Sequence, residues 1–341
     1  VIMVTGAQAA TARAIAAAVG IGPAEDLRVL EGRALGDGSE AGTDAIELTR
    51  AQVFARVTPA QKLDIVTAFQ DAAYVVAMTG DGVNDAPALK KADIGIAMGQ
   101  RGTDAAREVG DIILQDDRFE RIVAAIRHGR GIFANIRRSL MFMLCTNFAE
   151  VASVALATLA GAPLPLLPLQ ILYLNLLTDV FPALALAVGA APANIMQQPP
   201  RPAGEAILTR RHWLAIGAWS AIISATILGV LYLALTALGL DQASAVTVSF
   251  LTLGFSKLWF VFALREPATA PWRGTVVGNR WVWISLAVCG VLLVAAVHLP
   301  GLDRILGTAP IGGAGWLLVM AASLVPLMVG ELRRLALALR A

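Results

Sequence analysis

The segment Met78-Thr79-Gly80-Asp81-Gly82-Val83-Asn84-Asp85-Ala86-Pro87-Ala88-Leu89 follows a short apolar run and leads into a helical stretch. A strand, a glycine turn and a helix in this order indicate a βαβ unit. In such units the functional residues gather at the carboxyl ends of the strands. Asp81 and Asp85 bracket the turn and Asn84 lies between them. Because Mg²⁺ prefers oxygen ligands of this kind, the turn is predicted to hold Mg²⁺ beside a phosphate.

The residues around this segment repeat the same alternation. The expected strands are Val1–Val4, Val53–Phe54, Val75–Met78, Ile94–Met98 and Ile112–Leu114. The expected helices are Ala10–Val19, Gln61–Gln70, Ala86–Lys91 and Thr103–Val109. Strands that alternate with helices predict an α/β domain with a parallel, doubly wound sheet. The start of the chain lacks the basic region of a signal peptide, and its abrupt strand suggests a piece of a longer protein.

The composition divides the chain in two. Hydrophobic residues make up 57% and charged residues 15%, against about 25% charged in soluble domains. Residues 1–138 hold 16 Lys/Arg and 18 Asp/Glu, whereas residues 139–341 hold only 11 and 7. We therefore expect a soluble domain over 1–138 and a transmembrane domain over 139–341. The net charge of +2 argues against a nucleic-acid partner.

Six apolar stretches are long enough to cross a bilayer, at about 20 residues each. They lie at 139–160, 166–187, 212–236, 246–264, 281–299 and 315–332. Every second connection is rich in arginine, and the positive-inside rule places those connections in the cytoplasm. Residues 1–138 are then cytoplasmic too. The sequence predicts a multi-pass protein of a lipid bilayer, expected to be a bacterial plasma membrane.

Three ionisable residues lie within the expected spans: Glu150, Asp179 and Lys257. Such groups are costly at membrane depth and usually mark the path of an ion or substrate. Asn147 shares one helix face with Glu150, since the two are three residues apart. The alternative is that these side chains only join helices by hydrogen bonds.

Asn175, Thr178 and Asp179 share a face of the next span. Together with Glu150 they offer carboxylate, amide and hydroxyl oxygens, which suit a small hard cation. Pro182 follows one turn later and frees a backbone carbonyl, as in the broken helices that line ion sites.

Lys257 lies in the middle of its span. Its ammonium either pairs with Glu150 or Asp179, or extends toward a lipid headgroup. Pairing is favoured, because an isolated buried cation is costly.

The segment 78–89 resembles the hinge signature of the P-type cation-transporting ATPases, which are haloacid-dehalogenase-like phosphotransferases. The resemblance implies that Asp81 holds Mg²⁺, with Asn84 and Asp85 orienting that shell. Residues 55–62 are similar to the segment that carries the family's active-site lysine, here Lys62.

Two further segments carry the resemblance. Val1–Gly6 resembles the strand whose end holds phosphate oxygens, here with the Thr5 hydroxyl and the Gly6 amide. Tyr173–Asp179 followed by Pro182 resembles the sixth helix of type II pumps, and 195–202 resembles the loop after it. The implied ligands of the transported cation are Asn147, Glu150, Asn175, Thr178 and Asp179, modulated by Lys257.

The fold implied is a partial, Rossmann-type phosphorylation domain followed by an all-α bundle similar to helices five to ten of the calcium-pump branch. Three departures stand out. No Asp-Lys-Thr-Gly-Thr occurs, so the acceptor aspartate is absent from this chain. Ala7 follows Thr5-Gly6 where the family has aspartate. Lys257 stands where calcium pumps have an acidic or amide ligand, which favours one divalent ion or a proton-coupled variant.

These observations predict the C-terminal portion of an ATP-driven cation pump that uses ATP and Mg²⁺ and depends on a missing N-terminal half. The chain alone is predicted to be inactive. The helix over Arg127–Ile136 would carry the phosphorylation state to Glu150 as a rigid lever. One alternative is a non-catalytic membrane protein that binds Mg²⁺, a cation or a partner half. A membrane-anchored phosphatase is disfavoured, because the superfamily's nucleophile is missing.

Overall fold

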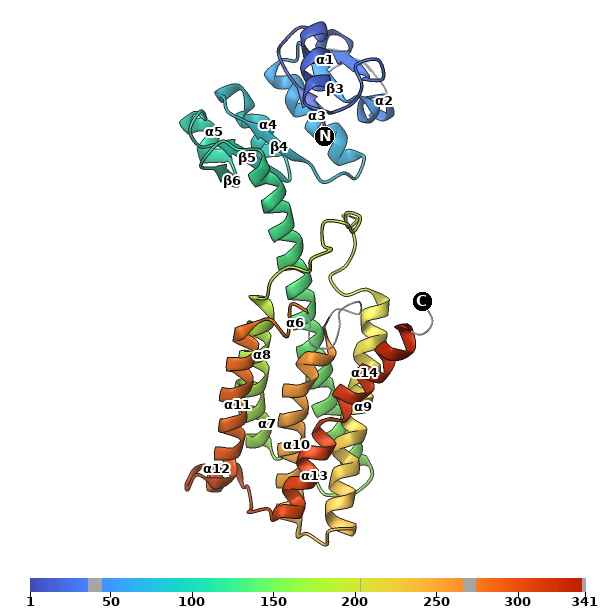
Figure 1. Cartoon of the computed structure of the whole chain (residues 1–341), viewed down its shortest axis with the longest axis vertical. Coiled ribbons are helices and arrows are strands. Elements are labelled where there is room, and N and C mark those ends of the chain that lie inside the picture. Colours follow the sequence, from blue (N-terminus) through green and yellow to red (C-terminus); the bar gives the residue numbers. More distant parts are fainter. Residues whose placement is uncertain (36–44, 203, 266–273, 339–341) are drawn as a thin grey trace. The chain divides into compact units, whose positions relative to one another are not determined.

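The computed structural model describes residues 1–35, 45–202, 204–265 and 274–338 (Figure 1). The chain divides into two compact units. The N-terminal unit is Val1–Ala125 with Arg201–Gly204, and the helical unit is Ile126–Pro200 with Glu205–Ala341. Helix α6 (Glu120–Leu159) crosses this division without a break, so the helix over 127–136 runs directly into the first span as expected. The first compact unit ends at Ala125 within this helix, and a domain boundary at 138 stays a prediction.

Two three-stranded parallel sheets form the N-terminal unit. Their strands are β1 (Met3–Val4), β2 (Val29–Glu31) and β3 (Val53–Ala55), and β4 (Ala77–Gly80), β5 (Ile94–Met98) and β6 (Ile112–Leu114). Their orders are β1-β3-β2 and β4-β5-β6. Parallel pairing is confirmed, for example Val4 with Phe54 and Gly80 with Ala97. The sheet is not single, because β1 and β4 are both edge strands and do not pair with each other in the described residues.

The helices of this unit are α1 (Ala9–Ala18), α2 (Ala45–Arg50), α3 (Pro59–Asp71), α4 (Ala86–Lys91) and α5 (Asp104–Val109), with 3₁₀ turns η1 (Gly32–Leu35) and η2 (Val83–Asp85). Helix α3 begins in a capping box. The Thr58 hydroxyl accepts from the Gln61 N–H at 3.3 Å, and Gln61 Oε1 accepts from the Thr58 N–H at 3.1 Å. Pro59 at the first position strengthens this start. The cap places Lys62 in the first turn of α3.

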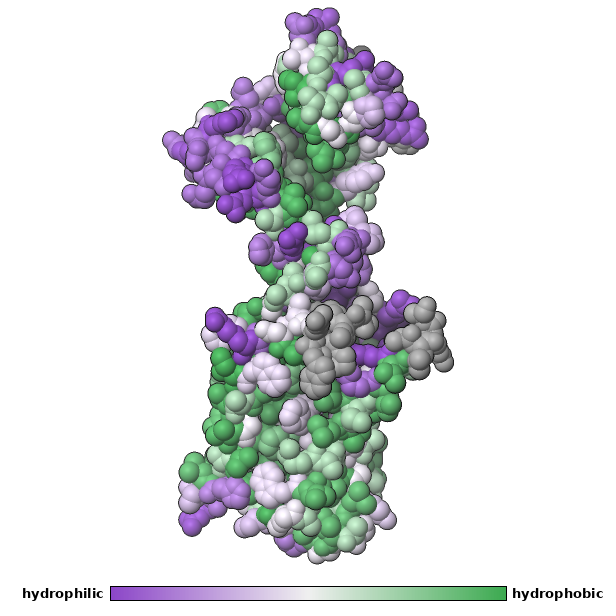
Figure 2. Space-filling model, in the orientation of Figure 1, coloured by the Kyte–Doolittle hydropathy of each residue, from purple (hydrophilic) through white to green (hydrophobic). Residues whose placement is uncertain are grey.

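The helical unit is built from α6, α7 (Pro168–Leu174), η3 (Asn175–Asp179), α8 (Val180–Ala187), α9 (Arg210–Thr236), α10 (Gln242–Ala263), α11 (Arg280–His298), α12 (Leu302–Leu306), α13 (Gly313–Ser323) and α14 (Val325–Ala338). Six helical segments in the described residues are long and apolar enough to cross a membrane. They coincide with the six predicted spans, so the chain is a multi-pass membrane protein. Figure 2 shows the apolar residues of this unit in green along the helices, with hydrophilic residues in purple at both ends.

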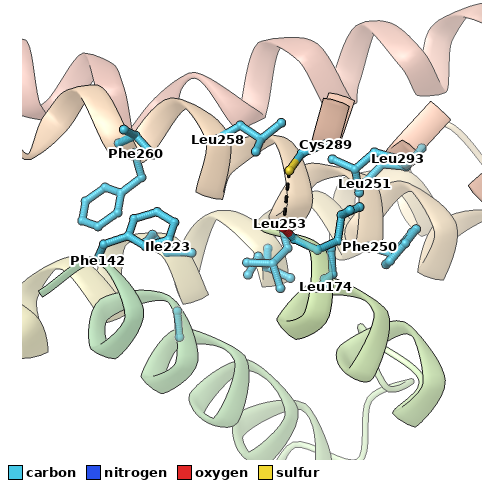
Figure 3. Packing of buried hydrophobic residues seen from close by; sticks show 14 of the residues in the cluster. Phe142, Leu174, Ile223, Phe250, Leu251, Leu253, Leu258, Phe260, Cys289 and Leu293 are labelled. Carbon is cyan, nitrogen blue, oxygen red and sulfur yellow. Dashed lines mark hydrogen bonds between the residues drawn. The ribbon is translucent and has the colours of Figure 1, made fainter. Parts of the chain in front are cut away.

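Helix α10 lies at the centre of the helical unit. It contacts α9, α11, α13 and α14. Of its most apolar 18-residue stretch, 94% is buried inside the protein. Figure 3 shows its side chains packed into the core, including Leu253, Leu258 and Phe260. Phe260 stacks on Phe142 of α6 with ring centroids 6.3 Å apart. A lysine on this helix therefore has no direct route to solvent.

Candidate functional site

The buried ammonium of Lys257 lies between two carboxylates on other helical segments. Its Nζ atom is 2.5 Å from Glu150 Oε1 on α6 and 2.7 Å from Asp179 Oδ1 at the end of η3. The Lys257 side chain is 0% exposed, and each carboxylate side chain is 4% exposed. The predicted pairing is confirmed, and it involves both acids where the sequence left a choice between them. We call these three residues the ion triad.

The amide of Asn175 joins the two acids of the triad. With its nitrogen turned toward them, it donates to Glu150 Oε2 at 3.0 Å and to Asp179 Oδ2 at 3.3 Å. Asn175 lies one turn before Asp179 on the same segment. The structure therefore brings together three of the five predicted cation ligands around the lysine.

The segment that carries Asn175 and Asp179 is a single π-helical turn. Such turns widen a helix and are frequent at functional sites. Pro182 lies three residues beyond and lacks the N–H that would bond the carbonyl of residue 178 in a regular α-helix. The neighbouring Leu177 carbonyl accepts from Cys289 Sγ of α11 at 3.3 Å, the dashed line in Figure 3. The helix continues from Pro168 to Ala187, so the proline is accompanied by a π turn and not by a break.

The remaining two predicted ligands, Thr178 and Asn147, differ in whether their side-chain oxygens form hydrogen bonds. The Thr178 hydroxyl is 0% exposed and donates to the Leu174 carbonyl at 2.8 Å. Asn147 lies one turn before Glu150 on α6, and its Oδ1 atom is buried without a hydrogen-bond partner among the described residues. The hydroxyl of Ser256, next to Lys257, is also buried without a partner there. Ser256 was not predicted, because a serine in an apolar span carries no signal of its own.

A second cluster lies between the carboxyl end of β4 and the first turn of α3 in the N-terminal unit. Lys62 Nζ is 2.6 Å from Asp85 Oδ1, and the two side chains are 16% and 11% exposed. Asp85 Oδ2 accepts from the backbone N–H groups of Gly82 at 3.2 Å and Asp81 at 3.4 Å. Asp85 thus fixes the glycine turn and ties it to α3. We call Lys62, Asp81 and Asp85 the turn cluster.

Gly80 makes this geometry attainable. A Cβ atom at position 80 would lie 2.5 Å from Asp85 Cβ, far closer than two carbons can approach. The sequence predicted a glycine turn here, but the close approach to Asp85 is visible only in the structure.

The remaining residues predicted to bind Mg²⁺ or phosphate are partly or fully exposed to solvent. Asp81 and Asn84 are exposed. The Thr5 hydroxyl accepts from the Ala7 N–H at 3.1 Å, and Gly6 is exposed beside it. These groups lie at strand ends, where a phosphate would be bound in a parallel α/β fold.

The turn cluster fits Mg²⁺ through Asp81. Its carboxylate is exposed at the end of β4, whereas both oxygens of Asp85 already accept hydrogen bonds. No group of three or more His, Cys, Asp or Glu side chains suited to a metal occurs in the described ranges. Mg²⁺ commonly uses one or two carboxylates and completes its shell with waters and phosphate. Direct ligation by Asp85 stays a prediction.

Comparison with protein families agrees with this architecture. Residues 163–336 match the model of the C-terminus of cation-transporting ATPases, and residues 1–93 match haloacid dehalogenase-like hydrolases. The chain therefore belongs to the cation-transporting ATPase family, which is a family of enzymes.

Named relatives are similar over almost the whole chain. Calcium-transporting ATPase 1 of Bacillus cereus (strain ATCC 10987 / NRS 248) is 35% identical, over 98% of this chain and 39% of the relative. Calcium-transporting ATPase of Bacillus subtilis (strain 168) is 36% identical, over 97% and 37%. Calcium-transporting ATPase 1 of Schizosaccharomyces pombe is 37% identical, over 98% and 38%. The chain spans about two fifths of the length of these relatives.

Proposed function

We propose that this chain is the part of an ATP-driven cation pump that contains the cation site and half of the phosphorylation site. The single observation that carries the proposal is the ion triad. Two carboxylates from separate helical segments converge in the bundle interior and already enclose one positive charge. A fixed arrangement of oxygen ligands at membrane depth is what cation transport requires.

The charge of the triad sets which ion it takes. Two carboxylates and one ammonium leave one net negative charge. A divalent ion bound by Glu150 and Asp179 is best accommodated when the Lys257 ammonium withdraws, since two cations would otherwise compete for the same oxygens. We therefore propose one divalent ion such as Ca²⁺, with Asn147, Asn175 and Thr178 as further ligands. The relatives named calcium-transporting ATPases support this choice of ion.

The turn cluster supplies this chain's share of phosphoryl transfer. The acceptor aspartate, which would take the γ-phosphate of ATP, lies outside this sequence. When bound, Mg²⁺ screens the negative charge of the transferred group. Asp81 would hold the ion, and Asp85 keeps the turn in place. Lys62 would leave Asp85 to bind the phosphoryl oxygens, for which the Thr5 hydroxyl and the Gly6 amide are the other proposed donors.

Two exposed strand edges support a missing half. Strands β1 and β4 each leave one edge unpaired in the described residues. A cavity of about 400 Å³ reaches both strands and the apolar face of α3. Ile2 and Val75, which line it, are 37% and 62% exposed. Unpaired edges with exposed apolar residues usually pair with or are covered by another segment, and we propose that the rest of the pump provides it.

The test is phosphoenzyme formation. Joining this chain to the residues outside the matched region of the Bacillus subtilis relative should give ATP-dependent, cation-dependent phosphorylation. The chain alone should show none, and vanadate-sensitive ATPase activity of the pure chain would contradict the proposal. Asp179→Asn in the joined protein should abolish the cation dependence.

A non-catalytic membrane protein that binds Mg²⁺, a cation or a partner half is the second candidate. Two observations favour it: Ala7 replaces the family's aspartate, and Lys62 is neutralised by Asp85. A joined protein that binds the cation but never becomes phosphorylated, even after Ala7→Asp, would support this candidate instead.

A further inference from the structure

Five arginines line a cavity of about 440 Å³ at the arginine-rich end of the helical unit. They come from three places in the chain: Arg137 and Arg138 on α6, Arg265 just after α10, and Arg333 and Arg334 on α14. Helix α9 closes the fourth side. We call this the arginine pocket. It is separate from the ion triad, because no residue of the triad lines it.

The pocket carries more positive than negative charge in the described part of the chain. Glu205 pairs with Arg137 at 3.1 Å, and Glu331 pairs with both Arg265 at 2.5 Å and Arg334 at 3.2 Å. Among the described residues, two glutamates face the five arginines of the lining. Arg333 is exposed and makes no ion pair within the described ranges. A site of this charge favours an anion, and arginine forks match phosphate oxygens well.

The wall of the pocket changes from charged to apolar along the helices. On α6 the arginines at 137 and 138 are followed one turn later by Met141, and on α9 His212 is followed by Ala215 and Trp219. Both sequences run from the helix end toward the apolar middle of the bundle. Such a gradient fits a molecule with an anionic head and an apolar tail, whereas a free phosphate would use only the charged end.

We propose that the arginine pocket binds an anionic phospholipid, with the headgroup phosphate at the arginines and an acyl chain along Met141 and Trp219. The positive-inside rule places this end at the cytoplasmic leaflet, which carries the anionic lipids. Basic pockets between membrane helices on that side bind anionic headgroups in other proteins. Lipid binding at this pocket does not depend on the ion triad. The experiment below can therefore fail without contradicting the proposed pump function, and the reverse also holds.

Native mass spectrometry of the delipidated full chain in a neutral detergent tests the site. The chain is offered equal amounts of dioleoyl-phosphatidylglycerol and dioleoyl-phosphatidylcholine. We expect the anionic lipid to be retained at least about tenfold more. Arg333→Gln should lower its retention about fivefold, the effect of one basic residue at a membrane surface. Arg333→Lys should retain most of the binding, because it keeps the charge.

Arg211→Gln is the matched control, since it removes the same charge from an exposed position at the start of α9 but does not line the pocket. It should leave retention within about twofold. Equal retention of the two lipids, or an equal loss in both glutamine variants, would overturn the proposal. Displacement of the lipid by millimolar inorganic phosphate would also overturn it, since the site would then take free phosphate. Thermal melting of each variant confirms that the fold is retained, which is expected because Arg333 is exposed.

Discussion

Lys257 on α10 and Asp179 at the end of the π turn form an ion pair of 2.7 Å with no exposure of the lysine side chain. Glu150, on a third helical segment, forms a second ion pair with the same lysine. The protein thereby carries its own cation at the position that we propose for the transported one. The predictions below follow from this placement and from the packing around it.

Lys257→Met is expected to destabilise the helical unit by roughly 3 kcal/mol, because it leaves two buried carboxylates without their ammonium. The measurement is denaturant unfolding of the full chain in detergent. The double variant Lys257→Met with Asp179→Asn should recover about half of the loss, since one of the two uncompensated charges is gone. Lys90→Met, at an exposed position on α4, should stay within about 0.5 kcal/mol. Strictly additive effects of the two triad substitutions would show that the groups do not interact.

Cys289→Ala is expected to cost about 1 kcal/mol more than Cys289→Ser, because serine can still donate to the Leu177 carbonyl of the π turn. Thermal melting in detergent gives the comparison. Cys145 is the matched control, since it is equally buried but donates no hydrogen bond in the described structure. There, serine should not be better than alanine. The same preference for serine at both positions would show that the hydrogen bond to the Leu177 carbonyl does not contribute to stability.

Gly80→Ala is expected to destabilise the N-terminal unit by about 2 kcal/mol, because the new methyl overlaps Asp85 and must displace it. The displaced carboxylate should release Lys62, and reaction of Lys62 with an amine reagent should become faster. Gly6→Ala is the control, since a Cβ atom there meets nothing within 4 Å. If Gly80→Ala melts at the same temperature as Gly6→Ala, the close contact with Asp85 has no energetic role.

Asp117 gives the N-terminal unit a sensitivity to acid. Its carboxylate accepts from the N–H groups of Gln100 at 3.0 Å, Arg101 at 2.9 Å and Gly99 at 2.7 Å. The bond from Gln100 is the largest of the causes that lower the pKa of Asp117 below its usual value. A lowered folded pKa stabilises the fold above the unfolded pKa, and this contribution is lost as the pH falls through the folded pKa.

The loop over residues 99–101 should therefore begin to lose protection as the pH falls below about 4. Hydrogen exchange of these three amides, corrected for intrinsic rates, is the measurement. Asp117→Asn should expose the loop at neutral pH and remove most of its pH dependence; it also tolerates the positive φ of 53° at this position. Protection of residues 99–101 that is equal at pH 3 and pH 7 in the unmodified chain would contradict the assignment.

The sequence predicted most elements because their signals are local. The six spans follow from length and hydropathy, and the turn at 81–85 follows from its glycines and carboxylates. Strand β2 and helix α2 were not predicted. The separation into two sheets was also missed, since strand order is a long-range property that no local pattern encodes.

Within the candidate sites, the residues could be predicted but not all of their partners. Lys257 was expected to meet Glu150 or Asp179, and only the packing of three segments shows that it meets both. Lys62 was expected to face a phosphate, whereas in the structure its ammonium bonds Asp85. Spacing reports which residues share a helix face, but it does not report which helices become neighbours.

The central claim is that the Lys257 ammonium occupies the place of a cation between Glu150 and Asp179. The most direct measurement is the calcium-dependent rise in melting temperature of the full chain in detergent, compared between the unmodified protein and Lys257→Met. The account predicts a clear rise in Lys257→Met, a much smaller one in the unmodified protein, and none when Asp179→Asn is added to Lys257→Met. Calcium responses of equal size in the unmodified protein and Lys257→Met would contradict it.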